Sequence, residues 1–130
     1  MSEQQPPDIP GAASVVSWFG WWPSFRHAQV IEVQLNTRGL SWLKVLAWNE
    51  SRDGKHNLVP EKHALVNFEL QGIVDLRLEG FDGGNPISGL EVERQANVFR
   101  LTLKPRAGIS GYVEASRIRV GVSPGKPRDK

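Results

Sequence analysis

The sequence predicts a mainly β protein, with an antiparallel sheet of about seven strands curled into a sandwich or an open barrel and one short N-terminal helix. The main observation is that apolar and polar residues alternate with a period of two from Ala28 to Val122, as they do in strands that bury one face. A second observation is that glycine, proline and asparagine cluster between the alternating segments, which is typical of turns.

The N-terminal part of the chain shows no strand-like alternation. Residues 1–10 include three prolines, and we predict a disordered arm there. Residues 11–19 are mostly small or apolar, and Gly20 follows them. Glycine at such a place favours the end of a helix. We therefore predict one short helix that ends at Gly20 and places Trp18 and Phe19 against the sheet.

The stretch from Trp18 to Val30 holds three of the five tryptophans and two of the five phenylalanines. It is too aromatic for a surface loop, and Pro23 favours an extended backbone at Trp22. Burying one large apolar side chain contributes about 1.5–3 kcal/mol, so we expect most of these rings in the core. The stretch is predicted as a buried bend that anchors the fold.

Seven segments carry the alternation, and we predict a strand for each of them: residues 28–36, 40–48, 63–71, 73–81, 87–94, 98–104 and 109–122. Apolar residues lie on both faces of 40–48, which indicates a central strand. Residues 49–62 contain six charged side chains and are predicted as a solvated loop.

The alternation is disturbed at two places in this pattern. It is interrupted at Gly72, which precedes the alternating residues Val74 and Leu76, and the apolar face changes near Ser116. An inserted residue reverses the alternation of a strand. We therefore predict a bulge or tight turn at Gly72 and a bulge or break near Ser116.

The charge distribution argues against a nucleic-acid or membrane partner. The net charge is +2, but basic residues concentrate in 124–130, a predicted disordered tail that follows a single domain at 11–123. Phosphate binding requires a clustered basic face, and the body of the domain is close to neutral. No apolar run is long enough to span a bilayer and no export signal is visible, so a cytoplasmic location is predicted.

The residue inventory argues against catalysis and against a bound metal or cofactor. There are no cysteines, which excludes disulfides, thiolate nucleophiles and zinc sites built on cysteine. His27, His56 and His63 are irregularly spaced, and no nucleophile–base pattern or phosphate loop accompanies them. We predict that the protein is not an enzyme and has no cofactor.

The aromatic stretch offers candidate binding residues beside its core residues. A platform of exposed rings for single-stranded nucleic acid needs flanking basic side chains, and Arg26 is the only one in the stretch apart from His27. One exposed ring, in this bend or at Phe81, would suit a protein interface. His27 fits a base, an anion contact or a structural role, and we favour the structural role.

Polar side chains form two further rows. Asp75, Arg77 and Glu79 share one strand face, and Arg117 and Arg119 share another. Rows of this kind are usually solvated sheet faces, which is the favoured interpretation. The alternative is a polar surface that recognises another protein.

Two stretches of the chain resemble the immunity protein 50 family. Residues 19–30 read Phe-Gly-Trp-Trp-Pro-Ser-Phe-Arg-His-Ala-Gln-Val, which is similar to the family phrase Gly-aromatic-Trp-Pro-Ser-Phe-His-Asp-Ala-Glu followed by a strand. Residues 74–82 and the loop after them are similar to the family's second segment. The resemblance covers most of residues 18–122, but the family's two acidic positions are replaced here by His27 and Gln29.

The resemblance implies an immunity protein of a bacterial polymorphic toxin system. Such a protein would bind a cognate toxin protein and neutralise it by stoichiometric blockade, without catalysis, as a monomer or a weak homodimer. The residues of the two stretches that would form the motif or contact the partner are Trp21, Trp22, Phe25, Arg26, His27, Phe81 and Asp82.

A small-ligand-binding β-barrel is the alternative function. Trp42 and Trp48 fall on one face of their predicted strand, and a closed barrel could place such a face around an apolar pocket. An interior filled by side chains would argue against this alternative.

Overall fold

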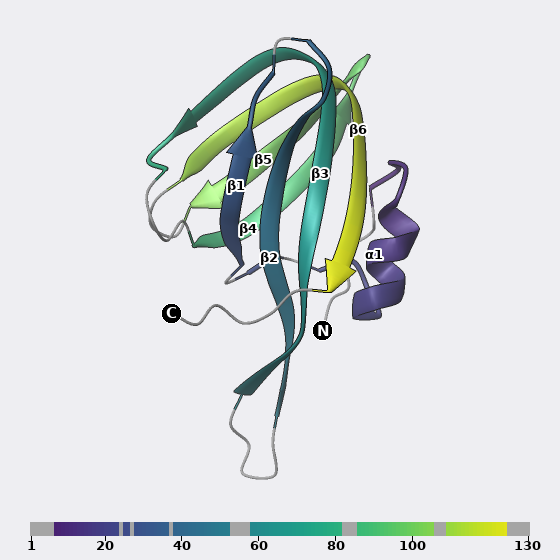
Figure 1. Cartoon of the computed structure of the whole chain (residues 1–130), viewed down its shortest axis with the longest axis vertical. Helices are drawn as coiled ribbons and strands as arrows, with labels where there is room; N and C mark the ends of the chain where they lie inside the picture. The colour runs from purple at the N-terminus through teal and green to yellow at the C-terminus, as the bar shows by residue number, and fades with distance from the viewer. Residues whose placement is uncertain are drawn as a thin grey trace.

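The computed structural model describes residues 7–23, 25–26, 28–36, 38–52, 58–81, 86–105 and 109–124. This part of the chain contains one helix and six strands, which are α1 (Ala12–Phe19), β1 (Gln29–Gln34), β2 (Ser41–Arg52), β3 (Leu58–Glu79), β4 (Ile87–Gln95), β5 (Val98–Pro105) and β6 (Ser110–Pro124). The strands form one antiparallel sheet in the order β1-β2-β3-β6-β5-β4, with α1 beside β6 (Figure 1). The predicted mainly β fold with one short N-terminal helix is confirmed.

The sheet curls over but does not close (Figure 1). Its two outer strands meet at one corner, through an isolated bridge between Gln29 and Pro86. At this corner the Ile87 N–H donates a hydrogen bond of 2.9 Å to the Ala28 carbonyl oxygen. Beyond it β1 and β4 diverge, so the described sheet is an open barrel, as predicted.

The two longest strands, β3 and β6, bend together along one line. Leu70 and Ile73 of β3 both pack in or against the core, whereas regular alternation would place them on opposite faces. Gly72 lies between them with a φ of +69°, and a Cβ there would lie 2.2 Å from the Ser116 hydroxyl oxygen. That hydroxyl donates a 3.1 Å hydrogen bond to the Gln71 carbonyl oxygen, which joins the two strands at the bend.

A β-bulge follows the bend on β3. Two consecutive residues of β6 pair with Ile73 and Asp75, so Val74 is the extra residue. The bulge restores the alternation that Gly72 interrupts, so that Leu76 lies opposite the buried Val113 of β6, and the chain continues in one strand without a turn. Residues 63–71 and 73–81, which the pattern predicts as two strands, are therefore one strand, and the described sheet has six strands.

The hairpin between β2 and β3 is longer than the sequence predicts. The predicted solvated loop over residues 49–62 is wrong for 49–52 and 58–62, because β2 continues to Arg52 and β3 begins at Leu58, while residues 53–57 lie outside the described part. The added pairs run from Asn49 with Glu61 to Arg52 with Leu58, and this ribbon projects beyond the other strands (Figure 1). Its sequence lacks the apolar alternation that marks the other strands, so the pattern does not predict it.

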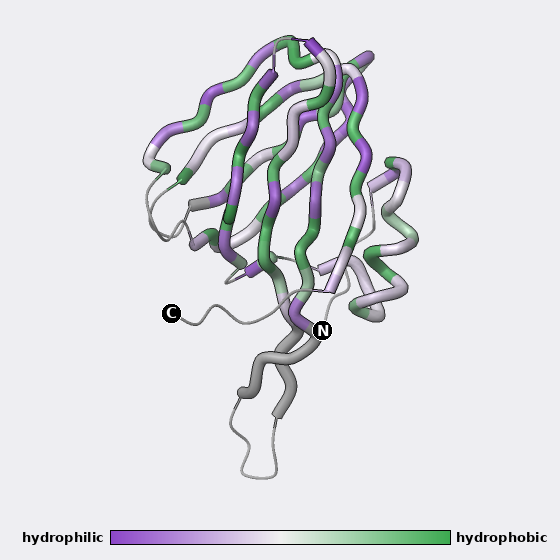
Figure 2. The backbone as a smooth tube through the Cα atoms, in the orientation of Figure 1, coloured by the Kyte–Doolittle hydropathy of each residue, from purple (hydrophilic) through white to green (hydrophobic). Residues whose placement is uncertain are grey.

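The core lies on the inner face of the curved sheet, and hydrophobic and hydrophilic residues alternate along the strands (Figure 2). Trp22 meets Phe25 edge to face with 5.8 Å between ring centroids, and Phe25 lies 6.0 Å from Phe68 of β3. Phe19, Trp22 and Phe25 are thus buried, as predicted for most rings of the aromatic stretch, whereas Trp21 is 44% exposed. The Gly20 N–H donates a 2.7 Å hydrogen bond to the Val16 carbonyl oxygen, which confirms Gly20 as the end of α1.

The segment before α1 covers an edge of β6. Among the described residues, the second half of β6 has β3 as its only strand partner. There the Val120 N–H donates a 2.9 Å hydrogen bond to the Pro10 carbonyl oxygen, and Ile9 is buried. The last residues of the predicted arm therefore protect a strand edge, while residues 1–6 and 125–130 lie outside the described part.

Replacing Gly72 with alanine tests the bend. We expect Gly72→Ala to lower the free energy of unfolding by about 1–3 kcal/mol, because alanine at positive φ is strained and its Cβ would displace the Ser116 hydroxyl. Gly121→Ala, where a Cβ meets no atom within 4 Å, is the control. Urea unfolding followed by circular dichroism measures both, and equal losses would contradict this role of Gly72.

Candidate functional site

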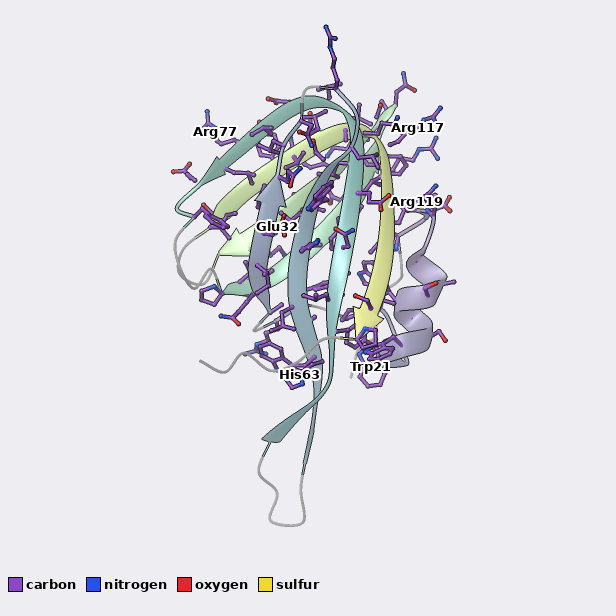
Figure 3. The ribbon with its side chains drawn as sticks, viewed as in Figure 1. Trp21, Glu32, His63, Arg77, Arg117 and Arg119 are labelled. Atoms are coloured by element: carbon purple, nitrogen blue, oxygen red, sulfur yellow. The ribbon has the colours of Figure 1, made fainter. Side chains whose placement is uncertain are left out.

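The aromatic residues of the predicted motif do not form one surface. Trp22 is 3% exposed and Phe25 is equally buried, so both belong to the core. Trp21 is 44% exposed and lies at the lower right of Figure 3, near the end of α1. Phe81 is also exposed, but it follows the end of β3, on the opposite side of the molecule in Figure 1.

The three other residues of the predicted motif are Arg26, His27 and Asp82. Arg26 is exposed, whereas His27 and Asp82 lie outside the described residues, so their roles stay predictions. Where the structure describes the chain, no three His, Asp or Glu side chains are grouped so that they could hold a metal ion. No helix in this part is long and apolar enough to cross a membrane.

Trp42 and Trp48 lie on the outer face of the sheet and not around an interior pocket. Leu43, the residue after Trp42, belongs to the core, and side chains alternate between the two faces along a strand. The Trp42 indole N–H donates a 3.2 Å hydrogen bond to Glu32, and Trp48 stacks against His63 with 5.3 Å between ring centroids. The inner face is filled by the core side chains, so these tryptophans do not support the barrel pocket of the alternative function.

The outer face of β5, β6 and the end of β3 carries polar groups that satisfy one another. Arg100 forms an ion pair of 2.7 Å with Glu114, and its guanidinium lies 4.3 Å from the centre of the Tyr112 ring. The Tyr112 hydroxyl donates a 2.9 Å hydrogen bond to Asp75, and chiefly this bond raises the pKa of Tyr112 above its usual value. This arrangement is typical of a solvated sheet face.

The exposed apolar side chains gather where β3 bends. The pairing of β2 with β3 ends at Leu70, so the rest of β3 has β6 as its only strand partner in the described residues. Val74 is 61% exposed and Leu76 is 37% exposed there. Leu35 and Leu40, at the connection from β1 to β2, are also exposed. Of the six large hydrophobic residues that are exposed in the described chain, four therefore lie in this region.

We call this end of the sheet the bend surface. Its exposed residues are Leu35, Leu40, Gln71, Val74, Leu76, Arg117 and Arg119. Two hollows open in it, and Gln71 borders both.

The first hollow, the edge cleft, has a volume of about 390 Å³. It is lined by the end of β1, the start of β2 and the bend of β3, through Leu35, Asn36, Gly39, Ser41, Gln71, Gly72, Ile73 and Leu76. The Asn36 backbone N–H donates a 2.8 Å hydrogen bond to the Ser41 hydroxyl, and its side-chain amide donates one of 2.6 Å to the Leu40 carbonyl oxygen. These bonds hold one wall of the cleft in place.

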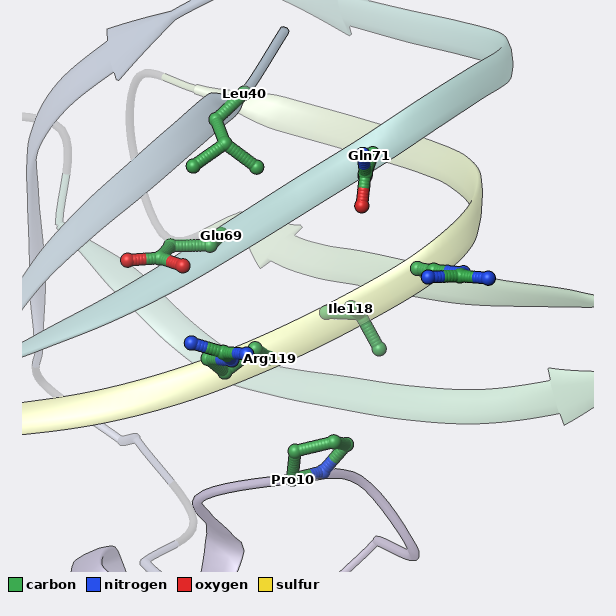
Figure 4. Close-up of a pocket in the computed structure, with 7 residues that line it drawn as sticks. Pro10, Leu40, Glu69, Gln71, Ile118 and Arg119 are labelled. Carbon is green, nitrogen blue, oxygen red and sulfur yellow. The ribbon is translucent and has the colours of Figure 1, made fainter.

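The second hollow, the arginine groove, has a volume of about 260 Å³. Its lining residues are Pro10, Leu40, Glu69, Gln71, Arg117, Ile118 and Arg119. Figure 4 shows it crossing β3 and β6, with Leu40 toward one end and Pro10 toward the other. Arg119 is the register partner of Glu69, and Arg117 is the register partner of Gln71.

The two arginines of the groove differ from other basic side chains of the sheet. Three ion pairs form among the described residues, and they are Lys44 with Glu32, Arg100 with Glu114, and Lys104 with Glu91. Neither Arg117 nor Arg119 forms an ion pair in that part of the chain, although Glu69 lies on the neighbouring strand. The groove therefore presents two positive charges that no described carboxylate contacts directly.

The sequence pattern pointed to the arginines but not to the apolar part of the bend surface. Arg117 and Arg119 alternate with apolar residues, and this made them a candidate recognition row. Val74 and Leu76 fall on an apolar strand face, which predicts burial, yet both are exposed. Val74 is exposed because it is the bulged residue, and Leu76 is exposed because the pairing of β2 with β3 does not extend beyond Leu70. Neither cause is visible in the alternation.

Comparison with known proteins found no relative: no known family, no curated protein and no solved structure matches the chain. The resemblance to the immunity protein 50 family stays a prediction from residues 19–30 and 74–82.

Substitutions of the neighbouring tryptophans separate their roles. We expect Trp22→Ala to lower the free energy of unfolding by about 3–5 kcal/mol, because it removes a core ring. Trp21→Ala should change it by less than about 1 kcal/mol, since that ring is half exposed. Urea unfolding measures both, with Trp22→Phe as a milder variant should Trp22→Ala fail to fold. A loss for Trp21→Ala as large as that for a Trp22 variant would contradict this assignment.

Proposed function

We propose that this chain is an immunity protein, which binds a cognate bacterial toxin domain in the cytoplasm and neutralises it by stoichiometric blockade. The observation that carries the proposal is the bend surface. There the exposed Leu40 lines one groove with Arg117 and Arg119, which form no ion pair with the described residues. The exposed Leu35 and Leu76 line the neighbouring cleft. This combination is typical of protein-binding surfaces. Arginine and large apolar residues contribute to interfaces more than their share of ordinary surface, and gathered apolar side chains on a monomer mark interaction sites.

The construction of the bend surface also suits a tight complex. Its residues come from β3, β6 and the connection between β1 and β2, and the strands that flank this connection are held in register by backbone pairing. A surface that is already ordered before binding loses little conformational entropy when the partner arrives. Blockade of a toxin requires such a preformed complementary surface and requires no catalytic group from this chain.

The resemblance of residues 19–30 supports a toxin as the partner. Within this proposal Trp22 and Phe25, which are buried, are architectural residues of the motif. Trp21 and Phe81 are exposed outside the bend surface and would be secondary contacts.

The edge cleft favours a second candidate, which is the binding of a small ligand. Its volume of about 390 Å³ falls within the range of roughly 300–1,000 Å³ that is usual for ligand pockets. Leu35, Ile73 and Leu76 give it an apolar lining. This candidate differs from the barrel alternative, because the cleft is lined by the connection from β1 to β2 and by the bend of β3, and neither Trp42 nor Trp48 lines it.

Co-expression with the toxin domain encoded beside this chain tests the proposed function. We expect the cells to survive a toxin dose that kills cells without this protein, and we expect the two chains to co-purify as a one-to-one complex, measured by light scattering. A catalytically inactive toxin variant permits the binding measurement without selection for survival. If the active toxin still kills cells that contain the folded protein, and no complex forms, the immunity proposal is wrong.

A further inference from the structure

We infer that the arginine groove binds an acidic segment of the partner protein, with Arg117 and Arg119 each receiving a carboxylate. This inference deepens the proposed function and rests on it for the identity of the partner. It rests on three observations at the groove. Arg117 and Arg119 form no ion pair with the described residues, their spacing along β6 is regular, and apolar residues line the groove beside them.

The two guanidinium groups of the groove have the charge and the spacing to bind two carboxylates. Arg117 and Arg119 are two residues apart on the outer face of β6, and both are exposed. Because a strand rises about 3.3 Å per residue, their Cα atoms lie about 7 Å apart. Alternate residues of an extended segment have the same spacing, so two acidic residues separated by one residue match the two guanidinium groups. Each guanidinium can then donate two parallel hydrogen bonds to one carboxylate.

The rest of the lining favours a protein segment over a nucleic acid. Leu40 and Pro10 are exposed and contribute apolar surface to the groove, which suits side chains that flank the acidic residues. None of the seven lining residues is aromatic, whereas grooves for single-stranded nucleic acid use rings on which bases stack.

Glu69 allows a test by the direction of the change, because removing its charge should change the affinity for an acidic segment in the opposite direction to removing an arginine. It is the cross-strand neighbour of Arg119 but makes no ion pair with it. Its negative charge therefore opposes an incoming carboxylate without being needed to hold the arginine. Replacing it with glutamine should tighten the binding of an acidic segment, and replacing either arginine with glutamine should weaken it.

The probe for the experiment is a fluorescein-labelled peptide Leu-Glu-Ala-Glu-Leu, and its matched control is Leu-Gln-Ala-Gln-Leu. Fluorescence anisotropy measures binding to the full chain at low and at physiological salt. We expect the acidic peptide to bind about tenfold more tightly than the control peptide, and added salt to weaken its binding. We expect Arg117→Gln and Arg119→Gln each to weaken it by about fivefold to tenfold, and Glu69→Gln to tighten it by about threefold.

Arg77→Gln is the matched control variant. It removes the same charge from an exposed position that lies outside the groove, on the left of the molecule in Figure 3 and away from Arg117 and Arg119. We expect less than a twofold change, which would show that position and not net charge decides the affinity. A loss equal to that of Arg119→Gln would overturn the inference. Stronger binding of a single-stranded oligonucleotide than of the peptide, lost in the same arginine variants, would overturn it as well.

The same variants in the toxin complex separate this inference from the proposed function. If the complex forms and the arginine variants weaken it while Arg77→Gln does not, the inference is supported. If the complex forms with unchanged affinity in Arg117→Gln and Arg119→Gln, the groove is not the contact, although the immunity proposal stands. If the peptide results hold and no toxin complex forms, the groove assignment stands and the immunity proposal fails.

Discussion

The bend at Gly72 and Ser116 is the constraint on which the arrangement of this sheet depends. A flat sheet would leave its apolar face uncovered, and a stable domain must bury that face against another layer. Here the sheet folds over its own inner face. Gly72 permits this because it turns the backbone at positive φ without a Cβ that would meet Ser116. The bulge at Val74 then restores regular pairing with β6.

The same bend separates the structural part of the molecule from its candidate binding part. The aromatic stretch fills the inside of the curve, where Trp22 and Phe25 pack on one another and Phe25 packs on β3. At the bend, by contrast, β2 begins at Ser41, so β3 beyond Leu70 has no partner on that side in the described chain. Apolar side chains such as Leu76 are therefore left uncovered there. The bend that lets the sheet enclose its core therefore also leaves the bend surface exposed.

The sequence predicts features that depend on neighbouring residues and misses those that depend on strand register. The end of α1 at Gly20 and the interruption of the alternation at Gly72 are local, and both were predictable from residue type and pattern. The strand pairing of residues 49–52 with 58–61 was not, because that ribbon lies outside the body of the sheet. The exposure of Leu76 and the groove at Arg119 arise where strands distant in sequence start, end and pair, which no single segment encodes.

Hydrogen–deuterium exchange of the one-to-one toxin complex tests most directly whether the bend surface is the binding site. In the free protein, amides on the unpartnered edge of β3 beyond Leu70 should exchange fast, because no strand of the described chain covers that edge. The account predicts that complex formation protects residues 71–77 and 116–119, while the β4–β5 hairpin keeps its free-state rates. Protection confined to that hairpin, or to the region of Trp21, with residues 71–77 unchanged, would contradict it.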